Sequence, residues 1–231
     1  MKIKNLSFKF DHTSDYFFKS LSVEFAPNQI NFIQGSNGVG KSTLFSILQG
    51  NTHSGMILEG SVELDNTSYE IKQNILDPKF TQQVKTVQQQ FDRMLANNFT
   101  FMQNLQLANL PTYPKLKSLP DVQNLPALVE KLNIPLATPA KLLSGGQRQI
   151  LAILMAIQKP TKVLLLDEPT ATLDQKNASM VIEFLQELVE QLQITVLIIC
   201  HDKELINKYS QYRAYSVYEE PTGLRSIKKE N

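Results

Sequence analysis

The stretch GSNGVGKST, residues 35–43, constrains this chain more than any other part of the sequence. Gly35, Gly40, Lys41 and Ser42 fit the pattern G-x-x-x-x-G-K-[ST], in which glycines let successive backbone N–H groups turn around an anion without Cβ clashes. The apolar run at 30–33 predicts a strand before the loop, and residues 43–48 predict a helix after it. A chance match at four positions would not explain this order. The sequence therefore predicts a phosphate-binding loop.

The residue types of this loop indicate what each part of it holds. The positive end of the helix dipole favours negative charge at the loop. Lys41 is expected to reach the β- and γ-phosphates of a nucleotide, and the Ser42 hydroxyl is expected to be a Mg²⁺ ligand. The residues expected to contact the nucleotide here are Gly35, Ser36, Asn37, Gly38, Val39, Gly40, Lys41, Ser42 and Thr43.

Composition argues against several other classes of function. Lys and Arg total 23 against 22 Asp and Glu, without a basic stripe that carries interleaved aromatics, so we expect no nucleic-acid partner. The opening MKIKNLSFKF does not resemble an export signal. The longest apolar run, at 150–157, is far shorter than the roughly 20 residues that span a bilayer. The single cysteine, Cys200, suits a reducing compartment and is expected to be a small buried apolar residue.

The rest of the chain predicts an α/β fold with a helical insertion. Alternating residues at 3–10 and 20–25 indicate short strands, while VLLLD at 163–167 and VLIIC at 196–200 are typical of strands buried on both faces of a parallel sheet. The helical pattern at 180–192 lies between those two runs and predicts a β–α–β crossover. Residues 91–140, with six of the eleven prolines between 111 and 139, predict short helices joined by proline-bounded loops.

A second anion site is predicted at LSGGQ, residues 143–147. Five of the nine glycines of the chain fall in this segment and in the phosphate loop. A serine hydroxyl and two glycine amides precede a helix that is expected to begin near Gln147, which is the arrangement of an anion site at a helix N-terminus. The chain would then have two anion-binding sites but only one nucleotide-binding motif. The second site is expected to serve the nucleotide of a neighbouring subunit through Ser144, Gly145, Gly146 and Gln147.

Taken in order, these motifs resemble the ATP-binding cassette (ABC) family over nearly the whole chain. LSGGQ is similar to the family's signature motif, and VLLLDEPTATLD at 163–174 is similar to its Walker B strand and D-loop. The resemblance implies that Asp167 holds Mg²⁺ and that Glu168 is the general base for the attacking water. The alternative for these adjacent carboxylates is a solvated turn at a strand end.

Further site residues follow from the same resemblance. His201, in CHD, matches the switch histidine that contacts the γ-phosphate, although a lone histidine after a strand is more often structural. TVQQQF at 86–91 offers three glutamines for the Q-loop, of which alignment selects Gln89, expected to bind Mg²⁺ and to act in catalysis. Gln88 and Gln90 would be bystanders, and a Gln-rich helix start is the alternative interpretation of this segment.

Phe10 falls where the family stacks an aromatic ring on adenine. The competing aromatic residues for this role are Tyr16, Phe17 and Phe18. Two departures from the family pattern are Cys200 in place of the threonine before the histidine, and Asn28-Gln29 in place of a Gly-Glu turn. Neither is expected to disturb the fold, because Asn tolerates a left-handed turn.

The resemblance implies the fold class, the activity and the partners. The fold would be a P-loop NTPase (RecA-like) core with an N-terminal antiparallel β subdomain and an inserted α-helical subdomain. We expect one ABC ATPase domain over 1–231, with the core at 1–88 and 159–231 and the helical subdomain at 89–158. The protein would hydrolyse ATP with Mg²⁺ and dimerise, as a homodimer or heterodimer, when ATP binds.

The expected role is the ATPase subunit of a bacterial transporter, cytoplasmic and held peripherally on the inner face of the membrane by an integral-membrane permease subunit. The sequence is most similar to cassettes of importers that work with a substrate-binding protein, so the cargo would be a small solute such as an amino acid. The alternatives are an exporter subunit of the lipoprotein or peptide type and a non-transport cassette such as an iron–sulfur assembly ATPase. A DNA-repair cassette would need a coiled-coil insertion for which the chain is too short.

Overall fold

The computed structural model describes residues 1–11, 13, 15–51, 55–110, 129, 134–209 and 211–230, and within these the chain forms two sheets. The first sheet is antiparallel, with the strand order β2-β1-β4-β5-β6. A shift in register within the β1–β4 pair falls between Lys4 and Ser7. The strands of this sheet are β1 (Lys2–Lys9), β2 (Phe18–Glu24), β4 (Ile57–Leu64), β5 (Thr67–Lys72) and β6 (Ile75–Leu76).

The second sheet carries the phosphate loop. Its order is β11-β10-β3-β9-β8-β7, and every neighbouring pair is parallel except β10 with β11. The strand before the loop, β3, is central and pairs with β9 on one side and β10 on the other. The strands are β3 (Ile30–Gln34), β7 (Val84–Val87), β8 (Val163–Asp167), β9 (Thr195–Ile199), β10 (Arg213–Glu219) and β11 (Arg225–Lys229).

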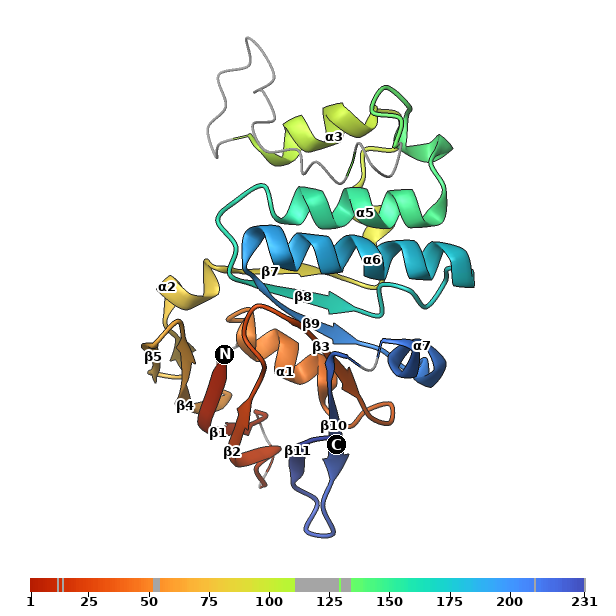
Figure 1. Ribbon diagram of the computed structural model, residues 1–231. Coiled ribbons are helices and arrows are strands. Elements are labelled where there is room, and N and C mark those ends of the chain that lie inside the picture. Colours follow the sequence, from red (N-terminus) through yellow and green to blue (C-terminus); the bar gives the residue numbers. More distant parts are fainter. Residues whose placement is uncertain are drawn as a thin grey trace.

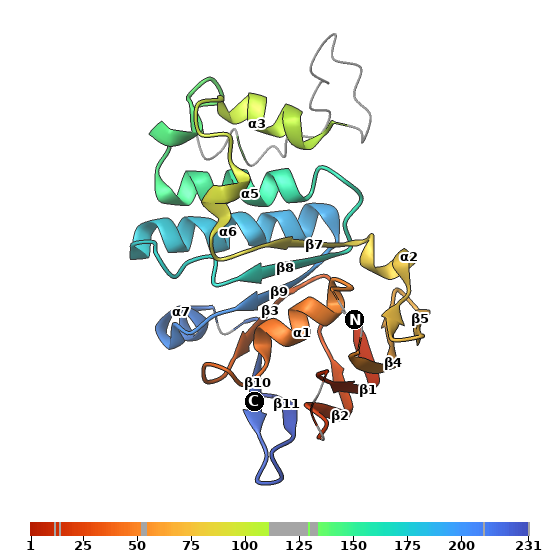
Figure 2. The same ribbon diagram turned by 180° about the vertical axis from the view of Figure 1, so that it is seen from behind.

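Helices cover both faces of the parallel sheet. In Figure 1, α5 and α6 lie on one face with α3 beyond them, and α1 lies on the other face beside the antiparallel sheet, an arrangement also seen from behind in Figure 2. The α-helices are α1 (Lys41–Leu48), α2 (Pro78–Thr81), α3 (Phe101–Ala108), α5 (Gly145–Ala156), α6 (Gln175–Leu192) and α7 (Lys203–Lys208). The described residues also form two 3₁₀ turns, η1 (Phe91–Met94) and η2 (Ala140–Leu142).

The alternation of side chains along the buried strands divides the core in two. In β8, Leu164 and Leu166 pack with α5 and α6, while Val163 and Leu165 pack with α1 and the antiparallel sheet. Both faces are covered, which is why the run VLLLD is continuously apolar. The predicted α/β class is confirmed, and with it the antiparallel β subdomain near the N-terminus.

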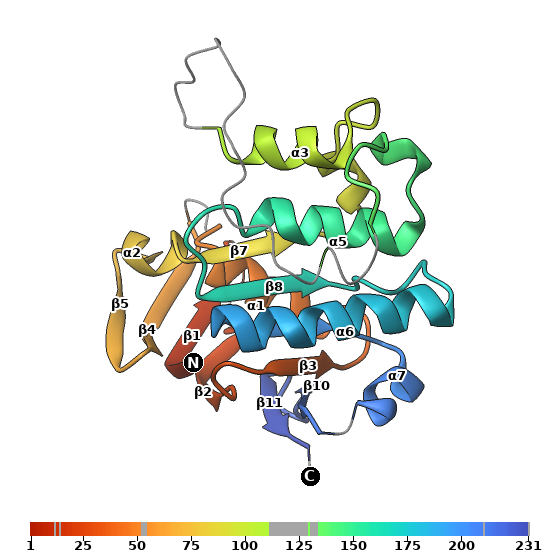
Figure 3. The same ribbon diagram turned by 45° about the horizontal axis from the view of Figure 1, so that its top comes forward.

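Strand direction and helix direction place all loops of functional interest on one edge. In Figures 1 and 3 the arrowheads of β7 and β8 point to the side at which α5 and α6 begin. Carboxyl ends of parallel strands and amino ends of the helices that follow them therefore meet at this edge, which is where open α/β sheets bind ligands. The core thus presents the phosphate loop, the end of β8 and the end of β9 together.

The helical insertion lies between Val87, where β7 ends, and Val163, where β8 begins. Thr100 starts α3 with a capping box, in which its hydroxyl accepts from Gln103 N and the Gln103 amide accepts from Thr100 N. The buried Asn104 fastens the preceding loop by four hydrogen bonds. The expected proline-bounded helices of 111–133 fall almost entirely outside the described residues. Residues 89–158 remain our proposed bounds for this subdomain.

Two local features can be compared with the sequence expectations. The helix expected near Gln147 begins at Gly145, because Ser144 supplies its N-cap. Asn28 adopts the left-handed conformation expected for the turn before β3, with φ 50°. Its backbone N–H donates to Thr195 Oγ1 at 3.2 Å.

None of the helices that the structure describes has the length and apolar character to cross a membrane.

Candidate functional site

A pocket of about 460 Å³ lies at the carboxyl edge of the parallel sheet, where β3, β8 and β9 end. It is the place where segments far apart in the sequence meet: the phosphate loop, the residues after β7, the end of β8 and the residue after Cys200. Its lining consists of Asn37, Gly38, Gly40, Lys41, Ser42, Thr43, Gln89, Asp167, Glu168, Ile199 and His201.

Gly35 and Gly40 of the phosphate loop lie where the side chain of any other residue would clash with its neighbours. Gly35 has φ +147°, and a Cβ on it would lie 2.4 Å from the Val217 carbonyl oxygen of β10. Gly40, the N-cap of α1, has φ +111°, and its Cβ would lie 2.5 Å from a ring carbon of Phe17. Gly35 and Gly40 thus let the loop backbone pass close to β10 and to Phe17, and a tight glycine turn of this kind can surround a phosphate with backbone N–H groups.

Lys41 is the first residue of α1, and its ammonium group lies on the carbonyls of the preceding loop. Nζ donates to the carbonyl oxygens of Gly35 at 2.8 Å and Ser36 at 2.9 Å. Burial lowers the pKa of Lys41, and the negative charges of Glu168 and Asp167 oppose that shift. The ammonium is thus held at the mouth of the loop, where a phosphate oxygen would be a charged acceptor that competes with two neutral carbonyls.

Two carboxylates at the end of β8 have different surroundings: Asp167 is the last residue of the strand and Glu168 follows it. Burial raises the pKa of Asp167, the neighbouring Glu168 raises it further, and Lys41 and His201 act in the opposite direction. Glu168 leaves the strand with φ 49°, a conformation that costs energy for any residue with a side chain. That backbone conformation is an observed strain at the position expected to hold the general base.

Glu168 is the meeting point of three segments. Gln89 Nε2 donates to Glu168 Oε2 at 3.0 Å, and His201 Nε2 lies 3.3 Å from Glu168 Oε1. The structure therefore brings together three residues that the sequence motifs place in three separate loops. Of the three glutamines at 88–90, Gln89 lines this pocket and contacts the carboxylate. Both carboxylates line the pocket, and their roles at the metal and as general base stay predictions.

The donor set is suited to a magnesium ion bound together with phosphate. Within the described part of the chain, no group of three or more His, Cys, Asp and Glu side chains could hold a metal ion alone. Mg²⁺ bound to nucleotides characteristically takes one or two protein oxygens and completes its shell with phosphates and water. Asp167 and the Ser42 hydroxyl, which both line the pocket, supply such oxygens.

Phe10 lies in a neighbouring cavity of about 780 Å³. Its ring is edge-on to that of Phe17 at 5.1 Å, and Phe17 separates this cavity from Gly40 of the phosphate loop. The guanidinium of Arg225, on β11, lies 4.6 Å from the Phe17 ring centroid. The role of Phe10 at a nucleobase remains a prediction. No sequence pattern indicates Arg225, because β11 meets β2 only through the tertiary fold.

The signature segment lies apart from this pocket within one subunit. Ser144 caps α5, with its hydroxyl accepting from Gln147 N at 3.2 Å and its own N–H donating to Gln147 Oε1 at 3.0 Å. Ser144, Gly145, Gly146 and Gln147 are not among the residues that line the phosphate pocket in the described chain. A Cβ on Gly146 would lie 2.5 Å from Met180 Cε and 2.7 Å from Asn177 Oδ1, so α5 and α6 are in close contact there.

Cys200, next to His201, is buried, as expected. Burial raises the pKa of its thiol to about 11, so it is protonated at neutral pH. A thiol in this state is a poor nucleophile.

Comparison with known proteins gives consistent matches. The profile of the ABC transporter family matches residues 18–171. A tyrosine transport ATP-binding protein of Clostridioides difficile (strain R20291) is 36% identical over 214 residues, which cover 87% of this chain and 82% of that protein. The structure of cbiO1 from Clostridium perfringens, part of the ABC transporter complex cbiONQ, has a TM-score of 0.71 and 25% identity, covering 93% of this chain and 83% of its own. A dimeric post-hydrolysis structure of the ATP-binding cassette MJ0796, bound to ADP and Pi, has a TM-score of 0.63 and 25% identity over 93% of each chain.

Proposed function

Because this chain belongs to the ABC transporter family, we propose that it drives a separate membrane permease by hydrolysing ATP in the pocket at the ends of β3, β8 and β9. The chain is an ATP-binding subunit of that family and an ATPase. The observation that supports this choice of pocket is the convergence on it of Lys41, Asp167, Glu168, Gln89 and His201.

The polar groups of the pocket have distinct chemical tasks in this proposal. The loop amides and Lys41 bind and orient the phosphates. Asp167 and the Ser42 hydroxyl, together with Gln89, would hold Mg²⁺, which when bound neutralises charge on the phosphate oxygens. Glu168 accepts a proton from the attacking water as the general base.

Gln89 and His201 both contact Glu168, so they orient its carboxylate as well as lining the space for the phosphate. This shared contact also ties the state of the base to two other segments of the chain, one after β7 and one after β9. It supports a role for Gln89 in catalysis in addition to its expected role at the metal.

The second anion site supports a shared-site dimer. Ser144 to Gln147 form a capped helix start that lies outside the pocket of their own subunit. In a two-fold pair, each pocket would be completed by the signature segment of the other subunit, which is a copy of this chain or a related chain. The related cassette MJ0796, whose dimeric structure contains ADP and Pi, supports this arrangement.

For the transported solute, we propose import of a small molecule such as an amino acid. Support comes from the tyrosine transport relative at 36% identity. The permease would hold the protein at the inner face of the membrane, and a substrate-binding protein would deliver the cargo. Purification from detergent-solubilised membranes tests this. Recovery of a permease with a solute-binding protein supports import, and recovery of a long-loop permease or of soluble assembly proteins contradicts it.

Substitution of Glu168 by Gln tests the proposed chemistry. The amide keeps the size of the side chain and can still contact Gln89, so the pocket should remain intact, but it cannot accept a proton. We expect turnover to fall by about 10² or more while ATP binding is kept. Because hydrolysis separates the subunits, the variant should accumulate as an ATP-bound dimer. Steady-state hydrolysis, nucleotide binding and sedimentation measure the three effects.

The matched control is Glu183→Gln, an exposed glutamate on α6 away from the pocket. It makes the same chemical change and should leave all three measurements unaltered. Hydrolysis by Glu168→Gln near the rate of the unmodified protein would exclude Glu168 as the base.

A further inference from the structure

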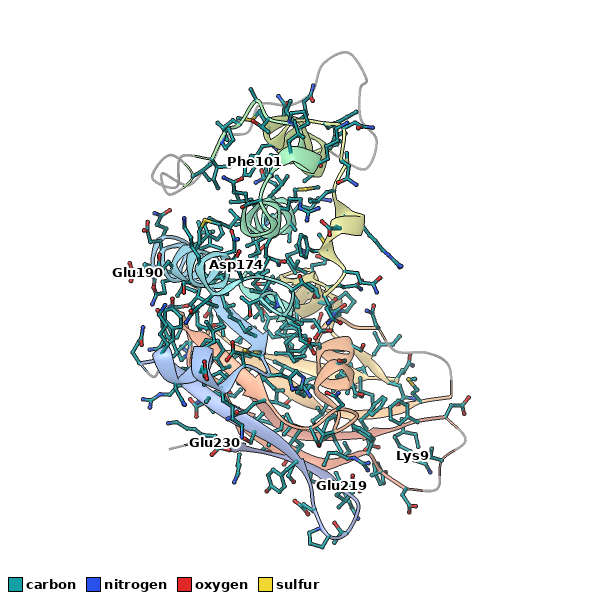
Figure 4. The ribbon with its side chains drawn as sticks, turned by 90° about the vertical axis from the view of Figure 1, so that its right-hand side faces the viewer. Lys9, Phe101, Asp174, Glu190, Glu219 and Glu230 are labelled. Carbon is teal, nitrogen blue, oxygen red and sulfur yellow. The ribbon has the colours of Figure 1, made fainter. Side chains whose placement is uncertain are left out.

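Asn177, in the first turn of α6, joins the signature serine to the start of that helix. Its Nδ2 donates to Asp174 Oδ2 at 2.8 Å, and its backbone N–H donates to Asp174 Oδ1 at 2.8 Å. On its other side, Asn177 Oδ1 lies 3.2 Å from Ser144 Oγ. Figure 4 views α5 and α6 nearly end-on from the side at which both begin, and labels Asp174 there.

The direction of these hydrogen bonds is fixed by chemistry. An ionised carboxylate only accepts, so the NH₂ group of Asn177 must face Asp174. The amide oxygen then faces Ser144 and can only accept, so the Ser144 hydroxyl must donate to it. The same Oγ accepts from Gln147 N. A serine hydroxyl has one proton to donate, and in this structure it is used in the hydrogen bond to Asn177.

The orientation of the amide is held by its surroundings. The hydrogen bonds from Asn177 lower the pKa of Asp174, so its carboxylate stays ionised at neutral pH. Gly146 leaves no room between the helices, since a Cβ there would lie 2.7 Å from Asn177 Oδ1. Asn177 is therefore held against α5, with its acceptor on the serine.

We propose that Asn177 is a positioning residue. In the separate subunit its amide oxygen accepts the hydrogen bond of the Ser144 hydroxyl, and on dimerisation the hydroxyl donates instead to a phosphate oxygen of the nucleotide carried by a second subunit. The inference rests on the proposed shared-site dimer. A phosphate oxygen is charged and accepts more strongly than a neutral amide, so the exchange is favourable. The bond to Asn177 must nevertheless be broken, and its strength reduces the affinity of ATP-driven dimerisation.

A purely structural role for this side chain would be to cap α6, but Asp174 performs that task through the backbone N–H of Asn177. That bond survives any substitution except proline. Changing the side chain at 177 therefore alters the acceptor presented to Ser144 while the cap remains. This separation makes the proposal testable by substitution.

Two substitutions should act in opposite directions. Asn177→Leu has similar size and no acceptor, so it frees the hydroxyl and should tighten ATP-driven dimerisation by about three- to tenfold, the usual worth of one hydrogen bond. Asn177→Asp offers a stronger acceptor and brings negative charge toward the phosphate, and it also replaces the donor to Asp174 by a carboxylate that Asp174 repels, so it should weaken dimerisation by about tenfold or more. The dimer dissociation constant with Mg-ATP is measured by sedimentation in the Glu168→Gln protein, where hydrolysis does not interfere.

Control variants separate the competing explanations. Gln175→Asp adds the same charge in the same exposed turn but does not touch Ser144, and it should leave the constant within about twofold. Asn177→Ala, which also lacks the acceptor, should shift the constant in the same direction as Asn177→Leu and covers the case in which leucine disturbs folding. Thermal unfolding of each variant verifies that the subunit is intact.

The outcomes distinguish this inference from the proposed function. If Ser144→Ala weakens dimerisation while the leucine and aspartate variants both weaken it or both leave it unchanged, the proton-holding role of Asn177 is overturned and the shared site stands. If Ser144→Ala leaves the constant unchanged, the shared site itself fails, and the role of Asn177 falls with it. Opposite shifts for leucine and aspartate support the inference.

Discussion

Gly35 and Gly38 lie three residues apart in the same loop, both at positive φ, yet an added methyl group should have very different effects at the two positions. At Gly38, φ is +76° and a Cβ would meet nothing within 4 Å, so only the backbone conformation is strained. At Gly35, φ is +147° and the methyl would lie 2.4 Å from the Val217 carbonyl oxygen. That oxygen belongs to the backbone of β10 and cannot rotate away.

The free energies follow from these contacts. A side chain in the left-handed region costs about 1–2 kcal/mol, and alanine offsets about 0.4–1 kcal/mol of this by restricting the unfolded chain, so Gly38→Ala should destabilise the fold by about 1 kcal/mol. Gly35→Ala has a conformational cost of that size or larger. It must also displace a strand, and overpacking of this kind costs about 1–3 kcal/mol. The sum for Gly35→Ala is about 2–5 kcal/mol, so it should be the more damaging variant by about 1–4 kcal/mol.

Thermal unfolding of the nucleotide-free proteins measures this difference. For a chain of this size, 1 kcal/mol shifts Tm by about 2–4 °C. Gly38→Ala should therefore melt about 2–4 °C below the unmodified protein, and Gly35→Ala about 4–20 °C below it. Equal melting temperatures for the two variants, or a larger loss at Gly38, would refute the close approach of the loop to β10.

Other perturbations test the buried charge, the thiol and the shared site. Burial raises the folded-state pKa of Asp167 above its usual 3.8. The contribution of Asp167 to folding stability is therefore complete below pH 3.8 and is lost as the pH rises through the raised pKa. Asp167→Asn should therefore raise Tm at pH 7, with the gain shrinking toward pH 4, and an unchanged or lower Tm at pH 7 would contradict the burial of that charge. Cys200, with its pKa raised from 9.0 to about 11, should react with iodoacetamide at pH 8 roughly a hundredfold more slowly in the folded protein than in urea, and equal rates would show an accessible thiolate. Lys41→Ala and Ser144→Asp, each inactive alone, should recover ATP-driven association or hydrolysis when mixed, because both lesions fall in one shared site; aspartate is chosen since it preserves the helix cap. No recovery in either assay, with mixed dimers shown to form, would remove the shared-site proposal.

The parts of the fold that can be predicted are those specified by neighbours in sequence. The phosphate loop is local, because its glycines lie directly between the strand before it and the helix after it. The runs before Asp167 and before Cys200 are continuously apolar because both faces of those strands are covered, and such runs are recognisable without a structure. The choice of Gln89 among three adjacent glutamines rests on the resemblance to the family and not on a local pattern, and in the structure Gln89 contacts Glu168.

The parts that cannot be predicted depend on contacts across the chain. Arg225 reaches Phe17 because β11 adds beside β2, and no local pattern in either segment indicates this. Asn177 resembles any polar residue of an exposed helix start until α5 is placed against it. The start of α5 is a different case, because the sequence analysis places it two positions too late although the pattern Ser144-x-x-Gln147 is a capping box that marks Ser144 as the N-cap.

The central place of β3 in the sheet determines the order in which the protein can be built. Its two neighbours, β9 and β10, come more than 160 residues later in the chain. At a synthesis rate of roughly 5–20 residues per second, the strand that carries the phosphate loop waits on the order of ten seconds or more on the ribosome before either neighbour has been made. During that time β1, β2 and β4 can pair with one another, but the loop has no sheet to hold it. A nascent chain therefore cannot acquire ATP early, and nucleotide cannot assist folding until the last third of the protein has been translated.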